Sequence, residues 1–301
     1  MEQVIVIDGV SKRFEDVTAL NNVSLDVQAG EIFGLIGPNG AGKTSLVRTI
    51  TGTIEPDSGE IHVFGEAPGQ GADDRIGFLP QAFAPPARLT GREILSYYAG
   101  LYPSHRIVDE VLAEVGMSDT ADRWFERLSG GEQRRICVGI TLINDPELLI
   151  LDEPTTGIDP SGRRDLWNVL ESMRQEGRSI LLTTHDMAEA TRLSDRVGLL
   201  SGGQLIEIGT PEGLIERHGG EGRLVMQLSE PTLEQPIELP EYQSRIVDEE
   251  LVVEGVTSTE LESVLRELQE RQVTFSRVTW EQPTLEDVFL TLTEFSEKDT
   301  S

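Results

Sequence analysis

Eight residues near the N-terminus have the types and spacing of a phosphate-binding loop. They fit Gly-x-x-x-x-Gly-Lys-Ser/Thr, with an apolar run at 31–36 before them and an expected helix at 45–50 after them. Glycines permit positive φ angles, so backbone N–H groups can approach phosphate oxygens, and the helix N-terminus adds further donors. The sequence therefore predicts nucleotide binding by the following residues: Gly37, Pro38, Asn39, Gly40, Ala41, Gly42, Lys43, Thr44 and Ser45.

Two residues of this loop have expected partners on the nucleotide. Lys43 would reach the β- and γ-phosphates, and the hydroxyl of Thr44 would bind Mg²⁺. A chance glycine-rich turn is the alternative, and the surrounding strand and helix patterns disfavour it.

Two adjacent carboxylates end a second apolar run. Residues 148–151 predict a buried strand that delivers Asp152 and Glu153 to the carboxyl edge of a parallel sheet, where ligands bind in open α/β sheets. Asp152 is expected to hold Mg²⁺, directly or through water, and Glu153 to polarise the attacking water as general base. A solvated strand end is the alternative, which the phosphate loop disfavours.

A second anion-binding helix start is predicted within residues 128–135. Ser129 would cap the helix, and Gly130 and Gly131 would leave its first amide groups bare. One nucleotide needs one such cradle, so the second indicates that the nucleotide of another copy docks there. An ordinary capped helix is the alternative.

The elements that must position these motifs predict two domains. Strands at 4–10, 23–27, 60–64 and 76–79 suggest a small antiparallel β-subdomain, and residues 84–143 a helical subdomain. Strands and helices then alternate to residue 200, which predicts a mostly parallel sheet with helices on both faces. We expect a domain over residues 1–219 and, after a glycine-rich linker, a small α+β appendage over 220–301, in which helices start at Ser258 and Thr284.

The charge of the chain limits its partners. The formal net charge is −28, and only Lys12, Lys43 and Lys298 are lysines. Such a surface argues against nucleic-acid binding, which needs a basic patch. Self-repulsion of this size suggests a high-salt cytoplasm, where it is screened. An acidic protein from an ordinary cytoplasm is the alternative.

The sequence also predicts a cytoplasmic location. It contains no apolar run of 18 residues and no signal-peptide pattern, so membrane association would come through a partner. The single cysteine, Cys137, fits a reducing compartment.

Together these motifs resemble the nucleotide-binding subunits of ATP-binding cassette (ABC) transporters over about the first 220 residues. The resemblance rests on the order and spacing of the phosphate loop, Gln81, the signature at 128–135, Asp152–Glu153, the turn at 156–160 and the histidine at 185. Residues 151–160 and 283–290 are most similar to the ABC-2 exporter ATPases of the daunorubicin-resistance-like group. The resemblance to this family implies a P-loop NTPase core, ATP as substrate and Mg²⁺ as cofactor.

The resemblance implies roles for four further residues. Phe14 would stack on adenine, where the family often has Tyr. Gln81 would contact Mg²⁺ or the attacking water and sense the membrane partner. Asp159 would bridge two copies, and His185 would hydrogen-bond the γ-phosphate and orient the general base.

One residue departs from the family signature. Glu132 stands where the signature most often has Gln. A carboxylate there would need solvent, or pairing with Arg134 or Arg135, to lie near the ATP of another copy.

The resemblance also implies partners and a transport function. Two copies, or this chain and a related cassette subunit, would bind two ATP molecules between the loop of one and the signature (Ser129, Gly130, Gly131 and Glu132) of the other. ATP hydrolysis would drive an integral-membrane permease. Through this permease the subunit would be bound peripherally to the inner face of the cell membrane. Two alternatives are a soluble cassette ATPase that remodels a protein complex, and a regulatory subunit with little turnover; Glu153 and His185 argue against the latter.

Overall fold

The computed structural model describes residues 2–71, 73–229, 239–247, 250–257, 259–271 and 273–298. The chain forms two compact units, Met1–Pro211 and Glu212–Ser301, each described here by itself. The division falls after Pro211, whereas the sequence placed a boundary at residue 219. The predicted helix start at Ser258 and the last three residues of the chain lie outside the described residues.

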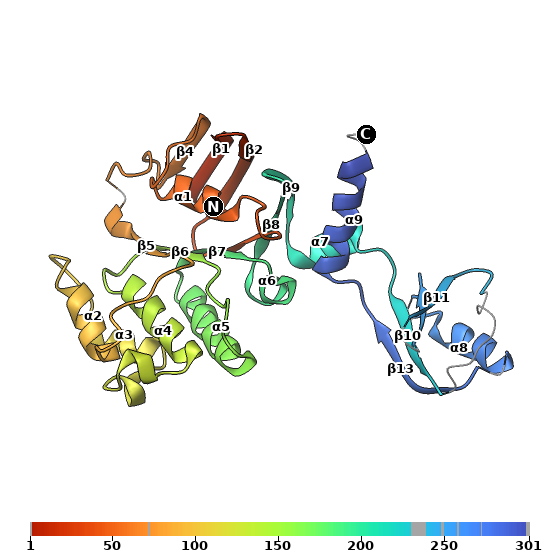
Figure 1. The fold of residues 1–301 in the computed structure, drawn as a ribbon. Coiled ribbons are helices and arrows are strands. Elements are labelled where there is room, and N and C mark those ends of the chain that lie inside the picture. The colour runs from red at the N-terminus through yellow and green to blue at the C-terminus, as the bar shows by residue number, and fades with distance from the viewer. Residues whose placement is uncertain are drawn as a thin grey trace. The chain divides into compact units, whose positions relative to one another are not determined.

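A six-stranded sheet is the centre of the first unit (Figure 1). Its strand order is β5-β6-β7-β3-β8-β9, and all neighbours are parallel except β8 and β9. Parallel strands of this kind deliver their carboxyl ends to one edge. The strands are β3 (Ile32–Ile36), β5 (Ile76–Leu79), β6 (Leu148–Asp152), β7 (Ser179–Thr184), β8 (Arg196–Ser201) and β9 (Gln204–Gly209).

Helices cover one face of this sheet, and α1 with a second sheet covers the other (Figure 1). Successive residues of a strand point to opposite faces, so β6 places Leu149 and Leu151 in one apolar cluster, and Leu148 and Ile150 in the other. This two-sided burial explains why these strands are continuous apolar runs. The helices of the unit are α1 (Lys43–Ile50), α2 (Gly91–Ala99), α3 (Val108–Glu114), α4 (Gly130–Thr141), α5 (Pro160–Gln175) and α6 (Met187–Leu193). Single 3₁₀ turns lie at Asp73–Arg75, Ser118–Thr120 and Phe125–Arg127.

The second sheet is antiparallel, with the order β2-β1-β4. Its strands are β1 (Gln3–Phe14), β2 (Val17–Gln28) and β4 (Ser58–Val63). The prediction that residues 76–79 join this β-subdomain was wrong: they form β5, which pairs in parallel with β6. A four-residue apolar run carries no information about its sheet, and here its partners come from residues 148–151.

The region between β5 and β6 is helical, as the sequence predicted. Thr90 caps α2 and Glu93 completes a capping box, so the first amide groups of that helix are satisfied. The buried faces of α2, α3 and α4 pack together through Ile94, Val111 and Ile136.

The second unit has its own apolar core beneath an antiparallel sheet with the order β11-β12-β10-β13. Leu224, Met226, Leu251 and Val253 point from the sheet toward Leu268 of α8. The elements are α7 (Pro211–His218), β10 (Arg223–Leu228), β11 (Gln243–Val247), β12 (Glu250–Glu254), α8 (Leu261–Glu270), β13 (Phe275–Glu281) and α9 (Leu285–Lys298). The sequence did not predict α7 or β9. Within the described ranges, none of the helices has both the length and the apolar character needed to cross a membrane.

Candidate functional site

The loop between β3 and α1 forms one wall of a cleft of about 570 Å³ at the carboxyl edge of the central sheet. Gly40 and Gly42 have φ angles of 83° and 108°, which residues with a side chain rarely adopt. A Cβ atom on Gly37 would lie 2.2 Å from the carbonyl oxygen of Leu200, so the loop packs directly on β8. The cleft is lined by Val17, Thr18, Ala19, Asn39, Gly40, Ala41, Gly42, Lys43, Thr44, Ser45, Gln81, Glu153, Thr156 and His185.

Lys43 lies at the centre of this wall and is only 5 % exposed. Its Nζ donates to the carbonyl oxygens of Gly37 at 2.7 Å and Pro38 at 3.2 Å. It also lies 3.3 Å from Oε1 of Glu153. The ammonium is therefore held inside the loop by two carbonyls and one carboxylate.

Thr44 and Asp152 place two oxygen atoms side by side below the loop. Thr44 Oγ1 donates to Asp152 Oδ2 at 3.0 Å. The other carboxylate oxygen accepts a 2.6 Å hydrogen bond from Thr183 Oγ1 of β7. Three segments, α1, β6 and β7, thus fix one carboxylate at the sheet edge.

The carboxylate of Glu153 connects most of the other polar groups of the cleft. Its Oε2 accepts from Gln81 Nε2 at 3.1 Å and from Thr156 Oγ1 at 2.9 Å. Nδ1 of His185 lies 3.4 Å from the same oxygen, and the imidazole is 49 % exposed. Burial alone would raise the pKa of Glu153, but the Thr156 hydroxyl, Lys43 and His185 outweigh it, so the pKa lies below its ordinary value.

The backbone of Glu153 is strained. Its φ angle is +47°, in the left-handed region that costs a non-glycine residue on the order of 1–3 kcal/mol. Its N–H donates to the carbonyl oxygen and the hydroxyl of Thr183, at 3.2 and 3.0 Å. The left-handed turn directs the chain away from the sheet immediately after β6, and the Glu153 side chain faces the loop.

The structure brings most of the predicted residues together. Residues 39–45, Gln81, Glu153 and His185 all line the cleft, and Asp152 is buried beneath Thr44. Phe14 does not line it: the ring is 42 % exposed and lies 5.7 Å from Lys12 Nζ. The signature residues 129–132 lie outside the cleft as well.

The signature forms the start of α4. Ser129 Oγ accepts from the N–H of Glu132 at 3.3 Å, and Glu132 Oε2 accepts from the N–H of Ser129 at 2.8 Å. This capping box gives the carboxylate at position 132 a local structural role. Its ion-pair partner is Arg123, at 3.6 Å, and not one of the two arginines that the sequence analysis offered as possible partners.

Arg134 and Arg135 of α4 contact other segments instead of Glu132. Arg135 pairs with Asp165 of α5, and Arg134 donates to the backbone carbonyls of Asp152, Glu153 and Pro154, at the end of β6. Asp159 caps the start of α5, since its Oδ2 accepts from the N–H groups of Ser161 and Gly162 at 3.2 and 3.4 Å.

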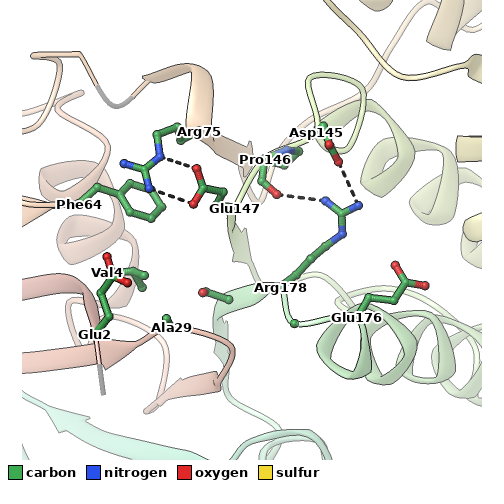
Figure 2. A pocket seen from close by; sticks show the side chains of 12 residues that line it. Glu2, Val4, Ala29, Phe64, Arg75, Asp145, Pro146, Glu147, Glu176 and Arg178 are labelled. Atoms are coloured by element: carbon green, nitrogen blue, oxygen red, sulfur yellow. Dashed lines mark hydrogen bonds and ion pairs between the residues drawn. The ribbon is translucent and has the colours of Figure 1, made fainter.

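A different pocket lies at the opposite edge of the sheet, where β6 and β7 begin (Figure 2). Arg75 stacks on the Phe64 ring at 3.6 Å and makes two hydrogen bonds to Glu147. Arg178 donates to the carbonyl of Pro146 and to Asp145. Both arginines of this pocket are thus engaged by residues next to the start of β6.

Sequence reasoning missed four residues that shape the cleft or its support. Val17, Thr18 and Ala19 line the cleft from β2, and Thr183 holds Asp152 and Glu153 from β7. Thr183 lies two residues before the predicted His185, but a threonine inside an apolar strand gives no sequence signal of its bonding partner. Thr156 was noted only as part of a turn.

Comparison with known proteins places this arrangement in a family. Residues 20–156 match the ABC transporter family. The daunorubicin resistance ATP-binding protein of Streptomyces coeruleorubidus is 35 % identical over 304 residues, covering 97 % of this chain and 96 % of that protein. A Nod factor export ATP-binding protein of Sinorhizobium fredii is 38 % identical over 307 residues, covering 98 % and 87 %.

Solved structures agree on the fold. An ATP-binding cassette of an ABC transporter in its ADP conformation has a TM-score of 0.65 at 22 % identity, covering 72 % of this chain and 95 % of that one. An ATP-binding subunit of an ABC transporter has a TM-score of 0.63 at 26 % identity, covering 72 % and 93 %. The phosphate loop, the paired carboxylates and these full-length relatives together establish that this chain is an ATP-hydrolysing subunit of the ATP-binding cassette transporter family, in the ABC-2 exporter group.

Proposed function

We propose that ATP is hydrolysed in the cleft at the phosphate loop, with Glu153 as general base and Gln81 and His185 as its neighbours. The observation that carries this proposal is the carboxylate of Glu153, which contacts Lys43, Gln81, Thr156 and His185 at one point of the cleft. A carboxylate with a lowered pKa is ionised at neutral pH, so it can accept a hydrogen bond from the attacking water.

Lys43 must exchange a contact when ATP binds. An ammonium has three protons, and all three directions are used, by Gly37, Pro38 and Glu153. To donate to a phosphate oxygen, Lys43 gives up at least one of them. Release of Glu153 would leave that carboxylate free to turn toward water and would remove one influence that lowers its pKa.

The residues below the loop fit Mg²⁺. Thr44 Oγ1 and Asp152 Oδ2 are hard oxygen donors 3.0 Å apart, and Mg²⁺ in nucleotide sites uses one or two protein oxygens with phosphates and water. When bound, Mg²⁺ would neutralise charge developing on the phosphates. Gln81, which is hydrogen-bonded to Glu153, would be the third contact.

The separation of the signature from the cleft supports a head-to-tail dimer. Ser129, Gly130 and Gly131 begin α4, and the N–H groups at a helix start favour an anion. Because they do not line their own chain's cleft, they would contact the ATP of a second copy or of a related cassette subunit. Asp159 would lie at the same interface, and Phe14, which pairs with the cleft residue Val17, would stack on adenine.

We further propose that the chain is peripheral on the inner face of the cell membrane, through an integral-membrane permease. Names of the relatives mention daunorubicin resistance and Nod factor export, which favours an exporter here. The alternative is a cassette ATPase that remodels a soluble protein complex.

The permease proposal is tested by capture. Tagged Glu153→Gln protein, with ATP and Mg²⁺, is expected to retain a stoichiometric multi-spanning protein from detergent-solubilised membranes, because it would bind ATP without hydrolysing it. Lys43→Ala protein serves as the matched bait that lacks ATP binding. Capture of a soluble partner in place of a membrane protein would favour the remodelling ATPase.

We also propose that the protein works at high salt. A formal net charge of −28 repels itself, and multimolar KCl shortens the screening length to about 3 Å or less. We expect the melting temperature to rise between dilute buffer and multimolar KCl. A melting temperature that stays constant or falls would contradict the proposal, and KCl is compared with an equal osmolarity of sucrose to separate screening from exclusion effects.

A further inference from the structure

Arg134 is a partly buried arginine that donates to the backbone around the general base. Its Nε donates to the carbonyl oxygen of Pro154 at 2.8 Å, and its Nη2 donates to those of Asp152 and Glu153 at 3.2 Å each. Among the residues that the structure describes, no carboxylate forms an ion pair with it. One planar guanidinium therefore spans three consecutive peptide units, which a lysine ammonium could not match in shape.

These three peptide units include the strained residue of the site. Glu153 has a φ angle of +47°, and such a conformation persists only where surrounding contacts over-determine it. Thr183 holds the N–H of Glu153 from one side, and Arg134 holds its carbonyl oxygen from the other. The two contacts together fix the direction in which the carboxylate leaves the backbone.

Arg134 belongs to the helix that the signature begins. It lies on α4, one turn after Gly130 and Gly131, so its position depends on where that helix start lies. The same helix start is in backbone contact with α5, because a Cβ atom on Gly131 would lie 2.6 Å from the Cα of Gly162. The turn between Glu153 and α5 is thus held at its beginning by Arg134 and at its end by the Gly131–Gly162 contact.

We infer that Arg134 is a positioning residue for Glu153, and that it ties the orientation of the general base to the signature helix. The inference rests on the proposed role of Glu153 in hydrolysis. Arg134 would connect two sites within one chain. One is the signature surface that would contact the nucleotide of another copy, and the other is the Glu153 carboxylate that would act on the chain's own nucleotide. Arg134 would act through the backbone carbonyls that it holds.

The test compares turnover with nucleotide binding in Arg134→Gln and Arg134→Lys. We expect Arg134→Gln to lower kcat about tenfold or more while the Kd for ATP changes by less than about threefold, since a misplaced catalytic group costs rate and not binding. Arg134→Lys should recover part of the loss, because an ammonium can reach some of the carbonyls. Arg178→Gln is the matched control: Arg178 is also largely buried and also donates to a carbonyl, that of Pro146, but at the opposite edge of the sheet (Figure 2).

A double-mutant cycle separates positioning from a general structural role. In the Glu153→Gln background, Arg134→Gln should have no further effect on the single-turnover rate, because the group that it positions is already disabled. Losses that multiply in the double variant would overturn the inference, and so would normal kcat in Arg134→Gln. Equal loss of ATP binding and turnover in both Arg134 variants, with a lowered melting temperature, would also overturn it in favour of a structural role. Absence of hydrolysis by the unsubstituted protein would instead refute the proposed function.

Discussion

Replacement of Glu153 by glutamine is expected to reduce steady-state ATP hydrolysis by roughly 10²- to 10⁴-fold, the usual contribution of a general base. Glutamine keeps the size of the side chain and can still contact Gln81 and Thr156, but it cannot accept a proton from water. ATP binding should persist, because the phosphate loop is unchanged and Lys43 loses a competing carboxylate. Phosphate release and equilibrium nucleotide binding are measured on the same preparation.

Glu31→Gln provides the control for this variant. Glu31 is also a buried carboxylate, 8 % exposed, but it pairs with Arg196 and lies before β3, away from the cleft. Its replacement should leave turnover within about threefold of the unsubstituted protein at a temperature where both are folded. If Glu153→Gln also kept turnover within that range, another group would have to be the base.

Replacement of Lys43 by alanine is expected to weaken ATP binding by about 10²-fold or more, since hydrogen bonds from a charged donor contribute about 1.5–3 kcal/mol each. The substitution removes the one ammonium that lines the cleft, and it leaves the buried carboxylate of Glu153 without its closest cation. With no ammonium beside it, that carboxylate would also repel the γ-phosphate more strongly. Titration with ATP in the presence of Mg²⁺ measures the change.

Arg48→Ala removes a positive charge from the same helix without altering the cleft. Arg48 is exposed in the last turn of α1, so this variant reports the long-range effect of one charge alone. We expect its Kd for ATP to change by less than about threefold in salt, where exposed charges are screened. Tight ATP binding by Lys43→Ala would refute the assignment of residues 37–44 as the phosphate loop.

Motifs with a local mechanism were predictable from the sequence. The phosphate loop, the capping box at Thr90, the N-cap at Ser129 and the apolar strand before Asp152 each depend on residues within a few positions of one another. Their chemistry is fixed by spacing, so they could be recognised without knowing their neighbours in space. The likeness to cassette ATPases then supplied Gln81 and His185, whose positions depend on the fold.

Contacts between distant segments could not be predicted in the same way. The pairing of β5 with β6, the contact of Thr183 with Asp152, and the position of Arg134 on three carbonyls join residues 18 to 72 positions apart. No pattern in either segment encodes the other. Glu132 illustrates the same limit, because its capping partner Ser129 was within reach of sequence reasoning while its ion-pair partner Arg123 was not.

The side chains of β6 alternate between two apolar clusters, and this affects how the free energy of ATP binding stabilises the layers of the first unit. Leu149 and Leu151 belong to the helical side, and Leu148 and Ile150 to the side of α1, so neither layer can separate without exposing the strand that both share. Unfolding of the first unit should therefore be cooperative. Energy gained when ATP binds at one edge then stabilises every layer of the unit equally, including helices that no nucleotide touches.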